Sequence, residues 1–150
     1  MPAHDYETDH QLMAVHCGRL ALRTRGDADV VDITDGVEAV LRTSEMKVGT
    51  AVAFVTGSTA ALTTMEYEPG GVADLRALLD LLVPARADWA HNERNHDSNA
   101  HAHLRAALIG PSECVPFVDG RLVLGTWQQL VLVDFDDRPR DRVVTVQVHG

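Results

Sequence analysis

The strongest constraint on the fold is a two-residue turn, Asp119-Gly120, between two apolar runs. Residues 117–118 precede the turn and residues 122–124 follow it. An Asp-Gly pair between β-prone residues is typical of a tight antiparallel hairpin, because both turn positions take positive φ angles. We therefore expect two paired strands here. The other strands of the chain should add to an antiparallel sheet that contains this pair.

Other β-prone segments recur along the chain, each bounded by turn signals. The expected strands cover residues 13–25, 30–33, 51–56, 59–65, 127–135 and 142–148. Residues 51–56 form an unbroken apolar run, so this strand should be covered on both faces. A charged turn at 136–140 should join the last two strands.

Two segments have helical spacing. Thr34 has the chemistry of an N-cap, and Val37, Val40 and Leu41 follow at helical intervals, with an end near Ser44. A second helix should span residues 72–83, and Pro84 should end it. We predict an α+β fold, a compact single domain over residues 13–150 with two main helices on packed, mostly antiparallel sheets, preceded by a loose arm at 1–12.

Composition excludes several classes of protein. The net charge of −9 over 150 residues argues against broad nucleic-acid binding, which needs a basic surface. The chain lacks an apolar run of the roughly 18 residues that a membrane span requires. The acidic N-terminus is unlike a signal peptide, so we expect a cytoplasmic protein in which Cys17 and Cys114 are free, buried thiols.

Histidines are concentrated in one segment. Four of the eight in the chain fall within the thirteen positions from 91 to 103. Imidazoles are the commonest protein ligands of divalent metals such as zinc, and carboxylates complete such sites. The segment is therefore a candidate metal site, although a histidine-rich loop can also be simply solvated.

The geometry of this segment decides which histidines can meet. If residues 99–105 are extended, as the alternation favours, Asn99, His101, His103 and Arg105 share one face. If they are helical, His96 joins Asn99 and His103, and His101 is excluded. Both geometries keep Asn99 and His103 together.

Two acidic residues are candidates for acid–base chemistry. Glu66 and Glu68 sit at a strand end before Pro69-Gly70, where a carboxylate can serve as a metal ligand or general base. The alternative is that both are exposed turn residues. Asp74 lies in the first turn of the second expected helix, where the helix dipole alone favours a negative charge.

Glycine-containing turns form a third constellation, at residues 110–113, 120–122 and 125–129. Glycine lets the backbone approach a ligand closely and frees N–H groups for an anion. The alternative is a set of tight hairpin turns with Trp127 in the core.

Together these motifs resemble the YjbQ-like family over roughly residues 13–150. The resemblance is carried, in chain order, by Thr59-Ala60-Ala61 with Glu66, His91, Asn99 with His103-Leu104-Arg105, Gly110-Pro111-Ser112, Val115-Pro116, Gly120-Arg121-Leu122, Leu124-Gly125-Thr126-Trp127-Gln128-Gln129, and Asp134-Phe135-Asp136 with Arg140 and Arg142. It implies an α+β fold of packed β-sheets that associates as a homotrimer. It also implies a divalent-metal site, with zinc the expected ion, at His91 and His103 with His101 adjacent.

The resemblance further implies a weak secondary thiamine-phosphate synthase activity. This reaction joins a pyrimidine diphosphate to a thiazole phosphate and releases pyrophosphate. In such an enzyme we expect Glu66 or Asp74 to act as base or outer ligand and Arg105 as a cation for the leaving group.

We further expect Ser112, Arg121 and Gln128 to contact the small phosphorylated molecule, with Arg121 as an alternative cation to Arg105. Many family members have histidine at the position of Gly57, so an enzyme of this type would lack one imidazole here unless His101 replaces it. The alternatives are a metal- or anion-binding trimeric module without turnover, and a structural trimer with buried histidines.

Overall fold

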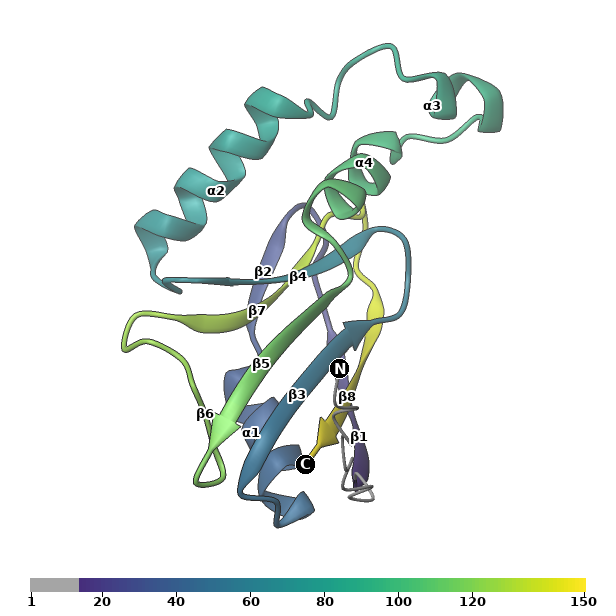
Figure 1. Ribbon diagram of the computed structural model, residues 1–150. Helices are drawn as coiled ribbons and strands as arrows, with labels where there is room; N and C mark the ends of the chain where they lie inside the picture. Colours follow the sequence, from purple (N-terminus) through teal and green to yellow (C-terminus); the bar gives the residue numbers. More distant parts are fainter. Residues whose placement is uncertain (1–13) are drawn as a thin grey trace, which may run out of the picture.

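The computed structural model describes residues 14–150, which form eight strands and four helices (Figure 1). The expected N-terminal arm lies outside the described residues. One sheet has five strands in the order β1 (Val15–Arg23), β8 (Asp141–His149), β3 (Val48–Val55), β5 (Ser112–Val118) and β6 (Arg121–Leu122). The other has three in the order β2 (Asp29–Asp32), β7 (Gln129–Asp134) and β4 (Ala60–Met65). The helices are α1 (Thr34–Ser44), α2 (Pro69–Leu82), α3 (Ala90–Asn95) and α4 (Ala100–Ile109).

All neighbouring strands run antiparallel, so the predicted α+β class with antiparallel sheets is confirmed. The expected hairpin is present as β5 and β6. Asp119 and Gly120 have φ angles of 54° and 72°, as a tight turn of this type requires.

The three-stranded sheet is the middle layer of the molecule. On β7, Leu130 and Leu132 belong to the core shared with α1 and the five-stranded sheet. Val131 and Val133 alternate with them and pack in a second core toward α2 and α4. Because side chains alternate along a strand, β7 is buried on both faces, and the two cores lie on opposite sides of it.

Residues 100–105 belong to helix α4 and Asn99 is its N-cap, so the favoured prediction of an extended segment is wrong. Over seven residues the alternation of polar and small side chains imitates a strand. The helical period becomes visible only farther along the chain, where Ala102, Ala106 and Ile109 share the face that packs in the second core. The small side chains of Ala102 and Ala106 let α4 lie close to Ala61 on β4.

Helix α2 begins at Pro69, three residues earlier than predicted. The carboxylate of Glu68 is the reason, because it accepts hydrogen bonds from the backbone N–H groups of Gly70, at 2.8 Å, and Gly71. Glu68 therefore acts as a helix cap. At α1 the N-cap is Ile33, and Thr34, predicted as the cap, is the first helical residue.

Two burial predictions are wrong. On β3 only the inner face is buried, and Phe54 on the outer face is 46% exposed. Cys17 and Cys114 are free as expected, but both lie exposed on strands β1 and β5. Among residues 14–150, nothing thus covers these positions on the outer face of the five-stranded sheet.

Arg105 joins α4 to the end of α2. Its guanidinium donates to the carbonyl of Val83 from Nε at 3.0 Å and from Nη2 at 2.8 Å, and Nη2 also donates to Asp80 at 2.6 Å. A cation at a helix C-terminus satisfies free carbonyls and the dipole together. Within residues 14–150, no helix is long and apolar enough to cross a membrane.

Candidate functional site

A cavity of about 410 Å³ opens where the β3–β4 loop, the start of α4 and the turn after β7 meet. The polar side chains in its wall include Ser58, Thr59, Asn99, His103, Arg140 and Arg142. A smaller, mostly apolar cavity of about 240 Å³ adjoins it and shares Gly57, Ser58 and His103. We call these the polar cavity and the apolar cavity.

A buried ionic network forms the wall of the polar cavity. Arg142 donates from Nε and Nη2 to the two oxygens of Asp134, at 2.7 Å each, and from Nη2 to Thr59 Oγ1, also at 2.7 Å. Asp134 is 0% exposed and Arg142 is 7% exposed. Paired contacts of this kind fix the orientation of a guanidinium as well as its charge.

Asp136 organises the other half of the network. Its carboxylate accepts hydrogen bonds from Arg140 Nε at 2.6 Å, Thr59 Oγ1 at 3.1 Å and Asn99 Nδ2 at 3.3 Å. Burial by itself raises the pKa of Asp136, but the hydrogen bonds from Arg140, Asn99 and the Asp137 backbone outweigh it and hold the pKa well below its usual range. Asp136 is therefore a fixed anion that positions its neighbours.

Asn99 and Gly57 leave polar groups open at this wall. The Oδ1 atom of Asn99 is buried and has no hydrogen-bond partner within residues 14–150. Gly57 has a φ of 128°, and a Cβ built on it would lie 2.8 Å from Nη1 of Arg142. The absence of a side chain at Gly57 therefore exposes that nitrogen to the cavity.

Two of the predicted metal ligands are neighbours. The rings of His91 and His103 have centroids 4.7 Å apart and are tilted by 42°. Asn92 holds α3 in place for this contact, because its Oδ1 accepts a hydrogen bond from the first backbone N–H of α4, that of Ala100, at 2.9 Å.

His101 lies on another face of α4, as the helical geometry requires. It is buried, and its Nδ1 atom has no partner among the described residues. Burial, followed by the nearby charge of Arg105, lowers the pKa of His101. Within residues 14–150, no three histidine, cysteine, aspartate or glutamate side chains are grouped as a metal site. The chain therefore brings together two of the three expected ligands.

Glu66, Asp74 and Gln128 lie away from His103. Glu66 follows the far end of β4, and Asp74 is exposed on α2. Gln128 stands beside that same strand end, where its Nε2 donates to Thr64 Oγ1 at 3.1 Å.

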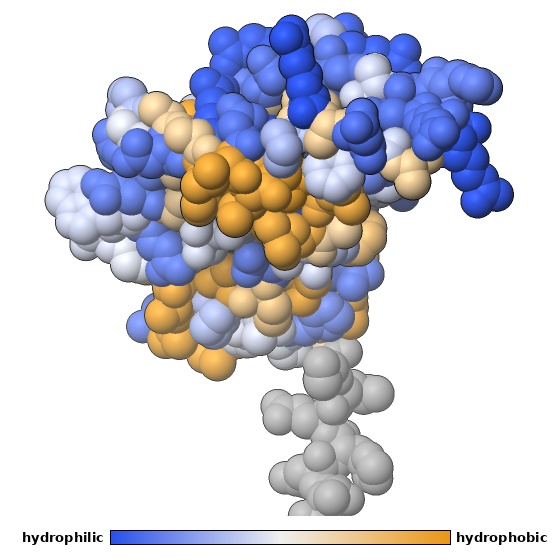
Figure 2. All heavy atoms as spheres, turned by 90° about the horizontal axis from the view of Figure 1, so that it is seen from above, coloured by the Kyte–Doolittle hydropathy of each residue, from blue (hydrophilic) through white to orange (hydrophobic). Residues whose placement is uncertain are grey.

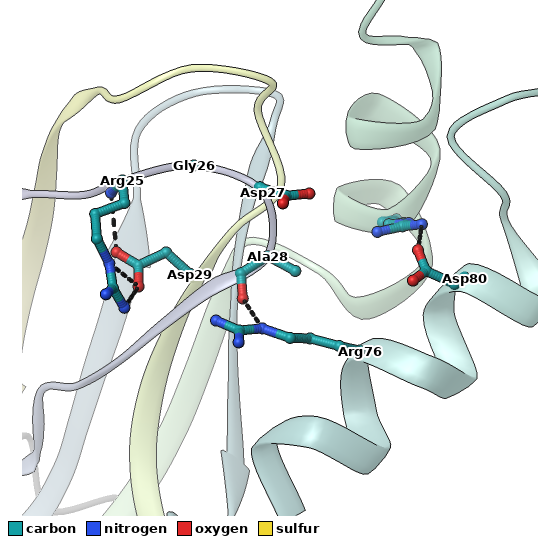
Figure 3. Close-up of a pocket in the computed structure, with 8 residues that line it drawn as sticks. Arg25, Gly26, Asp27, Ala28, Asp29, Arg76 and Asp80 are labelled. Atoms are coloured by element: carbon teal, nitrogen blue, oxygen red, sulfur yellow. Dashed lines mark hydrogen bonds and ion pairs between the residues drawn. The ribbon is translucent and has the colours of Figure 1, made fainter. Parts of the chain in front are cut away.

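Ser112 and the two predicted cations occupy other places. Ser112 begins β5 next to Pro111 of the apolar cavity, and Arg121 lines a separate cavity with Glu38 and Arg42. Arg105 is among the residues that line another cavity, of about 350 Å³. Figure 3 shows this cavity between the 25–28 turn and α2.

The charged side chains around the 350 Å³ cavity are largely paired within the chain. In Figure 3, Arg25 is paired with Asp29, and Arg76 donates from Nε to the carbonyl of Ala28 at 2.9 Å. Arg105 is paired with Asp80 at 2.6 Å. Arg105 is thus held by the fold, apart from the cavity that contains His103.

Asp136, Arg140 and Arg142 were not expected as site residues. The sequence feature that could have indicated them is the spacing of two aspartates and two arginines around one charged turn. That pattern also describes a solvated turn, and only the burial of Asp134 and Asp136 distinguishes the two cases.

We expect Asp136→Asn to lower the free energy of unfolding by about 1.5 kcal/mol, because it removes the charge that strengthens the hydrogen bonds from Thr59 and from Arg140, whose side chain is 34% exposed. Asp137→Asn, the same change at the exposed neighbouring position, should shift it by less than about 0.5 kcal/mol. Urea denaturation measures both.

The stability of the protein should also depend on pH through Asp136. Because the folded pKa of Asp136 is depressed, its contribution to the free energy of unfolding is complete above the unfolded pKa of about 3.9 and is lost as the pH falls below it. The wild type should therefore lose more stability than Asp136→Asn between about pH 5 and pH 2; equal losses would contradict the network.

Gly57→Ala should lower the free energy of unfolding by about 2 kcal/mol, since it adds a contact with Arg142 to an unfavourable φ. Gly110→Ala is the matched control, because Gly110 has a φ of 105° but open space around its Cβ position. The same denaturation measurement should give a smaller loss for Gly110→Ala. Equal losses would mean that Gly57 does not hold space open beside Arg142.

Comparison with known proteins places this arrangement in a family. Over residues 18–150 the chain matches the family described as UPF0047 protein YjbQ-like. A UPF0047 protein of Methanothermobacter thermautotrophicus is 38% identical over 138 residues, which cover 92% of this chain and 94% of that protein. YugU of Bacillus subtilis is 32% identical over 133 residues, covering 87% and 97%. The crystal structure of a YbjQ-like protein from Sulfolobus solfataricus superposes with a TM-score of 0.87 at 36% identity, covering 92% of this chain and 99% of that one. The chain therefore belongs to the UPF0047, YjbQ-like family.

Proposed function

We propose that the polar cavity binds the phosphate or pyrophosphate group of a small phosphorylated molecule. The observation that carries this proposal is the pair of arginines held at the cavity wall by buried carboxylates. The carboxylate oxygens of Asp134 and Asp136 already accept hydrogen bonds from protein groups. Nη1 of Arg142, by contrast, faces the space beside Gly57. A pre-positioned guanidinium recognises a phosphate oxygen without first having to be ordered.

His103 and Ser58 complete the proposed anion site. Both line the polar cavity, and His103 is only half-buried, so its imidazole can donate a proton or a hydrogen bond to a phosphate. Asn99 Oδ1 offers an acceptor to a hydroxyl or amino group next to that phosphate. The ligand class that suits these groups is a phosphate ester with a hydrogen-bond donor close to the ester.

A transferase with pyrophosphate as leaving group is the activity that we propose for this site. Arg140 and Arg142 would stabilise the charge that develops on a departing pyrophosphate. This is the step that a secondary thiamine-phosphate synthase performs when a pyrimidine diphosphate reacts with a thiazole phosphate. The support is the placement of the two cations, together with the family resemblance.

A divalent metal, with zinc the expected ion, is the proposed cofactor, and His91 and His103 are the residues that would hold it. Neutral imidazoles suit zinc, and the ring separation allows both to face one ion. Two protein ligands leave positions for the phosphorylated ligand or for a second subunit. When bound, the metal would supply Lewis-acid stabilisation of the pyrophosphate.

Binding without turnover is the second candidate function. Asp136, a buried carboxylate in the wall of the polar cavity, has a depressed pKa and four hydrogen bonds, which makes it a poor general base. This favours a module that holds a phosphorylated molecule and releases it unchanged.

A homotrimer is the proposed assembly. Figure 2 shows an apolar patch on the face seen from above, over α2 and α4. Five exposed leucines lie on these helices, with exposed fractions from 41% to 79%: Leu78, Leu81, Leu82, Leu104 and Leu108. A continuous apolar patch on one chain favours burial against another chain.

The anion site is tested by titrating pyrophosphate into the protein in a calorimeter. Arg140→Gln should weaken binding about tenfold or more, because a charged hydrogen bond to the anion is lost while Gln still donates to Asp136. Arg138→Ala, in the same turn but exposed, should leave the affinity unchanged. Binding that is absent in the wild type, or equal in both variants, would refute the proposal.

The metal and the activity are tested on protein purified without a histidine tag. We expect about one zinc per chain in the wild type, and a loss of it in His91→Ala and His103→Ala. His101→Asn should keep its metal, because His101 lies on another face of α4. Thiamine-phosphate formation in the wild type but not in His103→Ala would support the transferase; a metal-bound, pyrophosphate-binding protein without turnover would support the binding module.

A further inference from the structure

The loop between β6 and β7 presents a tryptophan to solvent. Trp127 is 72% exposed, so the alternative that it belongs to the core is wrong. Gln128 braces the loop, since its Oε1 accepts from the backbone N–H of Gly125 at 3.1 Å and its Nε2 donates to Thr64 at 3.1 Å. The loop projects on the left of Figure 1, away from the helices α3 and α4. A highly exposed tryptophan on a braced loop is typical of a residue that a partner buries.

The apolar cavity is of the right kind to receive such a side chain. Its lining includes Gly57, Ala60, Ala106, Ala107 and Pro111, and its volume is about 240 Å³. That is below the roughly 300–1,000 Å³ of pockets that bind whole small-molecule ligands. It is therefore a space for one ring, with His103 on the side that adjoins the polar cavity.

Helix α4, which lines the apolar cavity, also carries two exposed leucines. Leu104 and Leu108 each follow directly after a residue of the cavity wall, His103 and Ala107. Their side chains are 41% and 62% exposed. A chain that seated its tryptophan in the cavity would bury these leucines as well.

Trp127 and the apolar cavity of the same chain lie too far apart to meet. In the β4–β7 ladder, Gln129 pairs with Met65 and Asp134 pairs with Ala60. Trp127 is beyond the first pair and Gly57 is beyond the second. Five residue steps separate Met65 from Ala60, which corresponds to roughly 17 Å along the strand. Only a second copy of the chain can bring the two together.

A contact between two different surfaces of identical chains is a head-to-tail contact, which closes into a ring when the rotation between copies allows it. A ring of three is the assembly proposed above. In such a ring every Trp127 occupies the apolar cavity of a neighbouring chain, so no Trp127 and no apolar cavity stays exposed.

We propose that Trp127 of one subunit seats in the apolar cavity beside His103 of the next, so that each binding site is built from two chains. This inference rests on the proposed homo-oligomer and deepens the proposed site. It also accounts for the separation of the residues expected from sequence. Glu66 and Gln128 stand at the Trp127 end of β4, and the contact carries them to the neighbour's polar cavity. There Glu66 adds a further carboxylate to Asp136 and Asp141, which line the polar cavity of a single chain.

The fluorescence of Trp127 tests the contact without any ligand. The chain has two tryptophans, so Trp89→Phe leaves Trp127 as the one emitter. At concentrations where light scattering shows an oligomer, we expect Trp127 to emit at blue-shifted wavelengths and to be shielded from acrylamide. Dilution to monomer should shift the emission to the red. An oligomer with a fully quenchable Trp127, or a protein that stays monomeric at all concentrations, would overturn the proposal.

A substitution in the cavity wall tests where Trp127 goes. Ala107 is exposed in the single chain, so Ala107→Glu leaves the fold intact while it places a charge in the cavity. In the Trp89→Phe background, Ala107→Glu should expose Trp127 and weaken assembly about 30-fold, as the loss of a central interface tryptophan does. Ala85→Glu, at an exposed loop position, should change neither quantity. A shielded Trp127 in Ala107→Glu would show that the ring is buried elsewhere and overturn the assignment.

These measurements are independent of pyrophosphate binding. If Trp127 is shielded and Ala107→Glu exposes it, the shared interface stands even when the titration detects no anion. If the titration detects the anion and Trp127 remains exposed, the polar cavity functions within one chain and the shared site is refuted.

Discussion

The structure of the candidate site depends on two carboxylates buried where β7 ends. A buried charge is costly unless it is paired and hydrogen-bonded, and Asp134 and Asp136 meet this condition with Arg142, Arg140, Thr59 and Asn99. Those partners come from the β3–β4 loop, β8, the start of α4 and the turn between β7 and β8. The requirement to satisfy two anions therefore joins four parts of the chain at one point. The residues of this network also line the polar cavity, so the cavity lies where these four parts meet.

The same network separates structural from chemical roles among the charged residues. Asp134 and Asp136 have their oxygens occupied, so they position other groups. Arg140 and Arg142 turn part of their guanidinium surface outward, and Gly57 keeps that surface uncovered. His103 is supplied by α4 and its neighbour His91 by α3. The proposed anion site thus consists of the hydrogen-bonding groups at the cavity that have no partner among the described residues of the fold.

Much of the fold could be predicted from local sequence. The Asp119-Gly120 turn, the helical spacing from Val37 to Leu41 and the stop at Pro84 each depend on neighbouring residues, and the structure has the predicted elements at all three. Residues 99–105 were assigned wrongly because alternation over seven residues fits both a strand and a helix. The deciding contact, of Ala102 and Ala106 with β4, is made to residues 40 positions away. The family resemblance was also confirmed, because it rests on several ordered motifs.

The site could be predicted only in part. Asn99 and His103 were named together in either geometry, and both line the polar cavity. Arg105 was expected at the reacting centre, yet its side chain closes the end of α2. Asp136, Arg140 and Arg142 were named only within the family motif and not as site residues, because sequence does not reveal burial. Glu66 and Gln128 stand at the far end of β4, and the proposed contact between subunits explains how they can belong to the same site.

A crystal structure of the protein grown with pyrophosphate tests the central claim most directly. We predict the anion in the polar cavity, within hydrogen-bond distance of Arg142 Nη1 and of the guanidinium of Arg140, with the Asp134 and Asp136 contacts unchanged. An anion bound elsewhere, or a site in which the two arginines leave their carboxylates to reach it, would contradict the account.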